Sequence, residues 1–227
     1  MHSRFLRFMS LNLRLSNWLL AFSLIVTALV AMPVSAKLIN PSTQTILVFG
    51  DSLSASYGLP QGQGWVALLE AKLAQNQASK TTYKVVNASI SGETTSGGLA
   101  RFGEMLVTHK PSIVILELGA NDGLRGLPII EMQANLSKMI AQAKTVKAKV
   151  LLIGMKIPPN YGLKYSKNFS ATYTNLAKQH NIALVPFLLE GVAGKPDLIQ
   201  ADGLHPIAAA QPKLLENVWS TLEKMLI

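Results

Sequence analysis

Short apolar runs alternate with segments of helical spacing along most of this chain. Five of the runs have the length of β-strands, are rich in Val, Ile and Leu, and mostly do not alternate with polar residues. Strands that are buried on both faces have this pattern. The runs cover Thr45–Phe49, Lys84–Ala88, Ile113–Leu118, Val150–Met155 and Ile182–Phe187.

Between these runs, apolar residues recur three and four positions apart, as on one face of a helix. Such sets begin at Trp65, Leu99, Ile129 and Tyr165, and a last helix is expected from about Ala208 to Met225. Strand and helix thus alternate five times, which predicts an α/β fold with a five-stranded parallel sheet and helices on both faces. Ligands of such folds bind at the carboxyl ends of the strands.

The first 36 residues differ from the rest and have the pattern of a secretory signal peptide. Three arginines precede an uncharged stretch from Leu15 to Ala36, which ends in the small residues Val34-Ser35-Ala36. Cleavage after Ala36 would leave residues 37–227 as one domain in a bacterial periplasm or outside the cell. An uncleaved membrane anchor stays open, because the uncharged stretch is long enough to span a bilayer.

Composition narrows the choice of partners and cofactors. The formal net charge is +9, but the basic residues are scattered and no Arg-rich run is present, which indicates a solvated surface rather than a nucleic-acid site. The same surface allows weak, transient contact with anionic membrane lipid. The chain has no Cys, and the histidines beyond the leader, at 109, 180 and 205, form no ligand cluster in the sequence, so no metal site is expected.

Two segments follow the first two predicted strands and carry candidate chemistry. In Gly50-Asp51-Ser52-Leu53-Ser54, the serine at position 52 lies at a strand-to-helix turn, where a nucleophile can be exposed. In the segment 87–94, Gly92 can direct a bare backbone N–H at a substrate oxyanion. Taken singly, Ser52 could be a helix cap and Gly92 an ordinary turn residue.

Two further segments complete the set. Asn121, in Gly119-Ala120-Asn121-Asp122 after the third strand, can donate its side-chain amide to the same oxyanion. Asp202 lies three residues before His205, so its carboxylate can fix the imidazole tautomer and leave the other nitrogen free to take a serine proton. Together the four segments provide a nucleophile, a base, an orienting acid and oxyanion donors, as acyl transfer requires. The sequence contains no Gly-x-Ser-x-Gly elbow, phosphate loop or dinucleotide motif.

These segments resemble the four signature blocks of the SGNH (GDSL) hydrolases, in the same order. The likeness extends to the periplasmic acyl-CoA thioesterase, lysophospholipase and arylesterase subfamily. It rests on Gly50–Tyr57, Val86–Glu93, Leu116–Gly126, Pro159–Gly162 and Asp202–Pro206. The resemblance implies a three-layer α/β/α sandwich with the flavodoxin-like strand order 2-1-3-4-5, no cofactor, and a monomer that acts on small acyl esters or thioesters, such as aryl esters, acyl-CoA thioesters and lysophospholipids.

The resemblance also implies a role for individual residues. Ser52, Asp202 and His205 would be catalytic, and Ser52, Gly92 and Asn121 would form the oxyanion hole. The loop Gly123–Pro128 corresponds to one that moves in relatives when substrate binds. The residues expected around the substrate are Asp51, Leu53, Asp122, Gly123, Leu124, Pro159, Asn160 and Tyr161. Two positions depart from the family pattern, because Ala120 and Ser56 stand where glycine is common.

Three other functions remain open at this point. The same residues could remove acetyl groups from an envelope glycan. The chain could instead be a lipid carrier that has kept the scaffold without catalysis, or an interaction protein of the envelope. The complete set of catalytic residue types argues against the carrier, and the lack of repeats and charge runs argues against an interaction protein.

Overall fold

A parallel five-stranded sheet forms the centre of the computed structural model, which describes residues 42–75 and 81–226 apart from the side chains of Ser42 and Pro159. The strand order is β2-β1-β3-β4-β5 and every neighbouring pair is parallel, so the predicted sheet and its order are confirmed. The strands are β1 (Ser42–Gly50), β2 (Thr81–Asn87), β3 (Ile113–Glu117), β4 (Lys149–Ile153) and β5 (Ala183–Val185).

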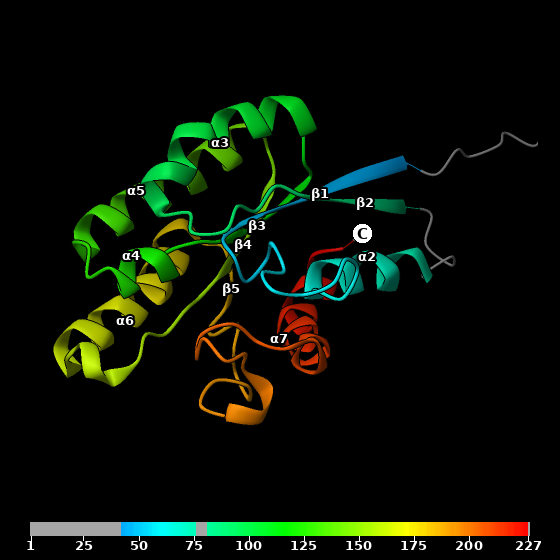
Figure 1. Cartoon of the computed structure of the whole chain (residues 1–227). Coiled ribbons are helices and arrows are strands. Elements are labelled where there is room, and N and C mark those ends of the chain that lie inside the picture. The colour runs from blue at the N-terminus through cyan, green and yellow to red at the C-terminus, as the bar shows by residue number, and fades with distance from the viewer. Residues whose placement is uncertain (1–41, 76–80, 227) are drawn as a thin grey trace, which may run out of the picture. The chain divides into compact units, whose positions relative to one another are not determined.

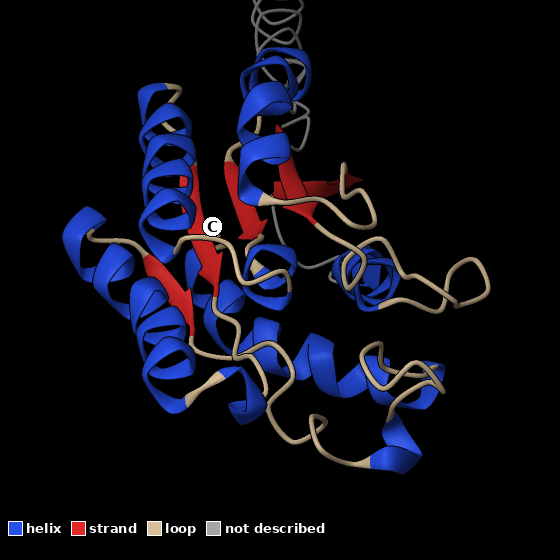
Figure 2. Ribbon diagram, turned by 60° about the vertical axis from the view of Figure 1, so that its left-hand side comes forward, coloured by secondary structure: helices blue, strands red, loops and turns tan. Residues whose placement is uncertain are grey.

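Helices cover both faces of this sheet, as predicted (Figures 1 and 2). On one face α2 contacts α7, and on the other α3, α5 and α6 pack side by side. The α-helices are α2 (Trp65–Gln75), α3 (Thr95–His109), α4 (Ala120–Leu124), α5 (Ile129–Thr145), α6 (Leu163–His180) and α7 (Gln211–Leu222). Single 3₁₀ turns are η1 (Pro159–Tyr161), η2 (Pro196–Leu198), η3 (Ala208–Ala210) and η4 (Glu223–Met225).

The last helix is shorter than its apolar spacing suggested. Residues 208–210 form a separate 3₁₀ turn, and the α-helix begins only at Gln211. Pro212 explains the break, because its ring would clash with the carbonyl four residues earlier if the α-helix extended back to Ala208. In the first turn of α7 the missing N–H of Pro212 costs little.

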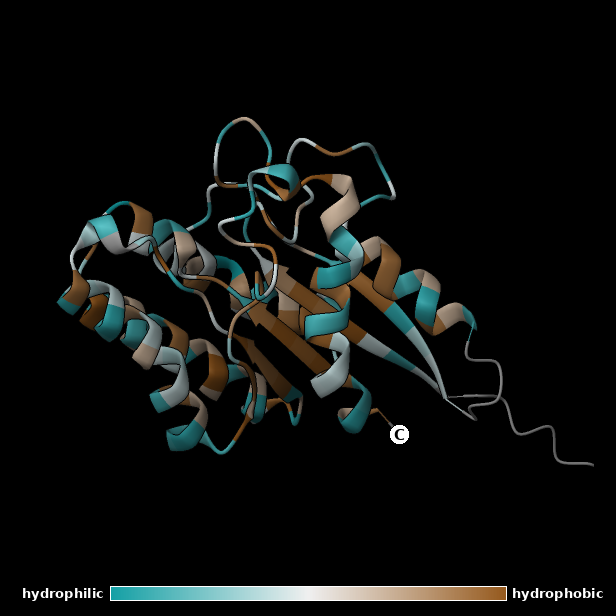
Figure 3. Ribbon diagram, turned by 90° about the horizontal axis from the view of Figure 1, so that it is seen from below, coloured by the Kyte–Doolittle hydropathy of each residue, from teal (hydrophilic) through white to brown (hydrophobic). Residues whose placement is uncertain are grey.

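Burial follows the apolar pattern of the strands. Residues 46–49 of β1 and all of β3 are buried, and the central strands are coloured hydrophobic along their length in Figure 3. Strand β2 lies at the edge of the sheet and alternates between covered and exposed positions. Because all five strands are parallel, the segments that follow β1, β2 and β3 meet at one edge of the sheet.

No helix in the described part of the chain is long and apolar enough to cross a membrane. The predicted signal peptide, residues 1–36, and the alternative anchor lie outside the described residues. The assignment of residues 37–227 to one domain therefore stays a prediction.

Candidate active site

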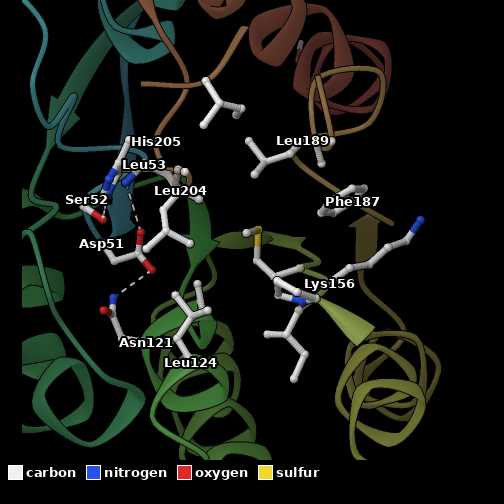
Figure 4. Close-up of a pocket in the computed structure, with 18 residues that line it drawn as sticks. Asp51, Ser52, Leu53, Asn121, Leu124, Lys156, Phe187, Leu189, Leu204 and His205 are labelled. Carbon is white, nitrogen blue, oxygen red and sulfur yellow. Dashed lines mark hydrogen bonds between the residues drawn. The ribbon is translucent and has the colours of Figure 1, made fainter. Parts of the chain in front are cut away.

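Ser52 lies in the turn that follows β1, and its hydroxyl meets an imidazole from a distant segment. The distance between Ser52 Oγ and His205 Nε2 is 2.8 Å, although the two residues are 153 positions apart (Figure 4). Backbone hydrogen bonds hold the turn, from the N–H of Ala55 to the carbonyl of Asp51 and from the N–H of Tyr57 to the carbonyl of Ser52. The turn that positions the serine hydroxyl is thus held by backbone hydrogen bonds and does not need the Ser52 side chain.

The other imidazole nitrogen, His205 Nδ1, lies 2.7 Å from Asp202 Oδ2. The second carboxylate oxygen, Oδ1, accepts the backbone N–H groups of His205 and Leu204. These hydrogen bonds, that of the His205 N–H foremost, lower the pKa of Asp202 to about 2. The carboxylate is therefore charged at neutral pH and can fix the orientation of the ring.

Gln200 connects this segment to the turn that carries Ser52. Its backbone N–H donates to the carbonyl of His205 at 2.7 Å, and its side-chain amide donates to the carbonyls of Tyr57 and Pro206. The ring of Tyr57 also packs on His205, with 4.6 Å between the ring centroids. The segment around His205 is thereby placed beside Ser52.

The three predicted oxyanion donors come from three different loops. The backbone N–H groups of Ser52 and Gly92 donate to no acceptor within the described residues, and Gly92 adopts φ +80°, which favours glycine. Asn121 Nδ2 donates to the carbonyl of Glu93 at 3.1 Å and, at 3.3 Å, to Asp51 Oδ2. The structure thus leaves two N–H groups open, whereas the amide of Asn121 makes two hydrogen bonds, of which the one to Asp51 is the longer.

A cavity of about 550 Å³ opens beside these groups (Figure 4). Ser52, Asn121 and His205 line one side, together with the predicted substrate residues Asp51, Leu53 and Leu124. Sequence reasoning missed the mainly apolar far wall, which follows the ends of β4 and β5. Its residues include Met155, Ile157, Pro158, Phe187, Leu189 and Ile199.

Other residues expected around the substrate lie outside this cavity. The carboxylate of Asp122 is buried and accepts the N–H and the hydroxyl of Thr95, so it joins the start of α3 to α4. Gly123 packs so closely against Phe169 that an added Cβ would lie 2.6 Å from that ring.

The remaining two described members of that set belong to η1 and do not line the cavity either. Asn160 is exposed, and the hydroxyl of Tyr161 donates to the carbonyl of Leu124. The side chain of Pro159 lies outside the described part of the chain.

Both departures from the family pattern have a visible local effect. Ser56 adopts φ +63°, a conformation that glycine adopts at less cost, and its side chain fills the space that a Cβ of Gly64 would need. Ala120 lines the cavity, so its methyl group narrows the space next to Asn121.

Sequence reasoning also missed Glu117, the last residue of β3. It is fully buried and level with Gly50 in β1, where a Cβ would lie 2.6 Å from its carboxylate. Glu117 Oε2 accepts the hydroxyl of Ser54 at 2.7 Å and the N–H of Asp51 at 3.3 Å. A carboxylate inside an otherwise apolar strand run was the signal that could have identified it.

Burial shifts the titration of both acids in this pair. It raises the pKa of Asp51 to about 6, and burial, with the charge of Asp51, raises the pKa of Glu117 well above its ordinary value. The folded chain therefore keeps protons that the unfolded chain releases above the ordinary carboxyl pKa values. The free energy of unfolding should fall as pH rises above this range.

Glu117→Gln should weaken this pH dependence, because glutamine keeps an acceptor for Ser54 and carries no ionisable group. We expect the unfolding temperature to drop less between about pH 5 and pH 8 in the variant than in the natural protein. Thermal unfolding at both pH values measures this. Glu104→Gln, at an exposed position of α3, is the control and should behave like the natural protein. An equal drop in Glu117→Gln would contradict the prediction.

No group of three or more His, Asp or Glu in the described ranges is arranged to hold a metal ion. The site instead combines a hydroxyl, an imidazole on a carboxylate, and N–H donors at the carboxyl edge of a parallel sheet. This fold and this geometry define a serine hydrolase.

Comparison with known proteins identifies the family. The model of the GDSL-like lipase/acylhydrolase family matches residues 48–211, and the chain belongs to this family. Esterase TesA of Pseudomonas aeruginosa is 54% identical over 185 residues, 82% of this chain and 90% of that protein. A crystal structure of TesA, also 54% identical, aligns with a TM-score of 0.78 over 81% of this chain and 100% of that one.

Two other relatives match over a similar share of this chain. An arylesterase of Vibrio mimicus is 45% identical over 82% of this chain and 92% of its own length. Thioesterase 1/protease 1/lysophospholipase L1 of Escherichia coli is 41% identical over 82% of this chain and 86% of its own length. The predicted family and the predicted class of hydrolase are thus confirmed.

Proposed function

We propose that this chain hydrolyses acyl esters and thioesters through an acyl-enzyme formed on Ser52. The observation that carries the proposal is the continuous arrangement of Ser52 Oγ, His205 and Asp202, with distances of 2.8 and 2.7 Å. A hydroxyl, a base and an orienting acid in this order generate a serine nucleophile.

In the first half of the reaction, His205 Nε2 takes the proton of Ser52 while Oγ attacks the carbonyl carbon. The resulting tetrahedral oxyanion is stabilised by N–H donors, and its collapse expels the alcohol or thiol, which takes the proton from His205. In the second half, water attacks the acyl-enzyme in the same way and releases the acid. Throughout, the charge of Asp202 stabilises the imidazolium.

Asn121→Ala should lower kcat by roughly 10²–10³, the usual loss for one oxyanion donor. The amide contributes in the transition state, so KM should change far less than kcat. Steady-state kinetics on a p-nitrophenyl ester measures both. The matched control is Asn160→Ala, at an exposed position outside the cavity. A loss carried by KM alone would contradict the role of Asn121.

The cavity supports acyl chains as the bound part of the substrate. Its far wall is mainly apolar, and its volume lies within the range of small-molecule sites. Esters and thioesters fit the names of the relatives: an esterase, an arylesterase and a thioesterase/lysophospholipase. We further propose that the chain acts as a monomer. Its place of action would be the periplasm or the space outside the cell, in agreement with the composition of its first 36 residues.

An acyl-chain series on p-nitrophenyl esters and acyl thioesters, with acetylated sugars alongside, tests the proposed function. We expect faster turnover of acyl chains that fill the cavity than of acetylated sugars, and labelling of Ser52 by a fluorophosphonate probe. Preference for acetylated sugars would instead identify a glycan deacetylase. Failure of the native protein to react with the probe would favour a lipid carrier.

A further inference from the structure

Four exposed apolar side chains gather around the starts of α5 and α6, close to the cavity. Leu127, in the loop between α4 and α5, and Ile130, in the first turn of α5, are 38% and 72% exposed. Tyr161, in η1, and Leu163, the first residue of α6, are 38% and 80% exposed. We call these four residues the apolar rim. Exposed apolar residues that gather in one place mark a site of interaction more often than scattered ones do.

Hydrogen bonds join the two segments that carry the apolar rim. The hydroxyl of Tyr161 donates to the carbonyl of Leu124 at 3.0 Å, and that of Tyr165 donates to the carbonyl of Leu127 at 2.8 Å. In Figure 1 the loop after α4 and the start of α6 lie at the same end of the helix layer. The rim is therefore one surface, because two tyrosine hydroxyls from the η1–α6 segment hold backbone carbonyls of the segment after α4.

This surface adjoins the mouth of the cavity. Leu124, which is bonded to Tyr161, lines the cavity, as does Pro158 at the other segment. The backbone N–H of Tyr161 donates to the carbonyl of Pro158, so the rim begins where the cavity wall ends. An acyl chain that left an apolar phase at the rim would enter the cavity that Ser52 also lines.

Three cations lie on the same two segments as the apolar rim, and one of them, Arg125, also donates to the carbonyl of Gly92 at 2.9 Å. Arg125, Lys164 and Lys167 are exposed and have no ion-pair partner among residues 42–75 and 81–226. Within 122–131 and 160–168, Glu131 is the one exposed acid. Apolar side chains beside unpaired cations complement a surface of acyl chains and anionic phosphates.

We propose that the apolar rim, with Arg125, Lys164 and Lys167, docks this chain on the surface of an anionic lipid bilayer. In the docked protein the cavity faces lipids that carry acyl esters. Docking is a property beyond the proposed hydrolysis, and it places the proposed active site next to a lipid substrate. Neutralisation of one cation near an anionic surface should weaken binding roughly fivefold. Loss of two exposed apolar side chains should weaken it by roughly tenfold or more.

Vesicle co-sedimentation of the full chain tests the docking, with Ser52→Ala throughout so that no lipid is cleaved. Vesicles of phosphatidylcholine are compared with vesicles that also contain phosphatidylglycerol. We expect preference for the anionic vesicles, weakened by salt, by Ile130→Gln/Leu163→Gln and by Lys164→Gln/Lys167→Gln.

Matched controls lie away from the rim. Val107 is 71% exposed in the last turn of α3, and Val146 is exposed at the end of α5. Val107→Gln/Val146→Gln and Lys138→Gln/Lys178→Gln, which neutralises two exposed lysines elsewhere, should bind as the parent does.

Binding without preference for anionic vesicles, or equal losses in rim and control variants, would overturn the proposal. So would rim variants that change self-association or protein binding but leave vesicle binding intact. Hydrolysis of soluble p-nitrophenyl acetate, measured with Ser52 present, should be the same in all variants. Cleavage of this ester without vesicle binding would contradict only the proposed docking. Vesicle binding without cleavage would contradict only the proposed hydrolase function.

Discussion

Ser52→Ala should lower kcat by roughly 10⁶, the loss seen when a serine nucleophile is removed from a catalytic triad. The variant cannot form the acyl-enzyme, and any remaining rate would come from oxyanion stabilisation and binding alone. The fold should survive, because the turn is held by backbone bonds to the carbonyls of Asp51 and Ser52 and by the bond from the Leu53 N–H to Asp51 Oδ1.

Hydrolysis of p-nitrophenyl acetate measures the loss, and circular dichroism confirms folding. Ser91→Ala is the control, because Ser91 is exposed in the loop beside Gly92 and should leave the rate nearly unchanged. If purified Ser52→Ala retained the activity of the natural protein, the nucleophile would have to be another residue.

His205→Ala should cost about as much, roughly 10⁶ in kcat, because serine and histidine act as a unit. His205 takes the proton of Ser52 during the attack, so the variant has no base at this position. The pKa of Asp202 is lowered to about 2, so its stabilising charge is present above the ordinary aspartate pKa and is lost only as pH falls toward 2.

Steady-state kinetics on p-nitrophenyl acetate, with His109→Ala as the control, tests this role. The control histidine is partly buried in the last turn of α3 and does not line the cavity, so its loss should leave kcat nearly unchanged. Activity retained by purified His205→Ala would argue against His205 as the base.

The sheet could be predicted from the sequence because strands buried on both faces leave continuous apolar runs. The polar segments after those runs led to Ser52, Gly92 and Asn121, since parallel strands bring their carboxyl ends to one edge. Strand order was less accessible to pattern alone and came from the family resemblance. The break before α7 was a local effect of Pro212, which the apolar spacing did not register.

Other features depend on contacts that spacing does not encode. The residues of the apolar wall around Phe187 could not be recognised in the sequence. An apolar residue after a strand gives the same sequence pattern whether its side chain faces the core or a cavity. Asp122, by contrast, was expected at the substrate site but has a structural role. A carboxylate next to Asn121 suggested substrate binding, whereas its partner in the structure is Thr95, on another helix.

Ser52 and the segment that carries Asp202 and His205 are held in the fold to different degrees. Ser52 follows β1, a strand buried between two neighbours in the sheet. Asp202, Gly203 and Leu204 are exposed, and their segment is held to its surroundings largely through Gln200. Exposed segments with few buried contacts open at lower free energy than cores do. Moderate heating should therefore abolish activity reversibly while the sheet is still folded. The upper temperature at which the enzyme works would then be set by the opening of one surface loop.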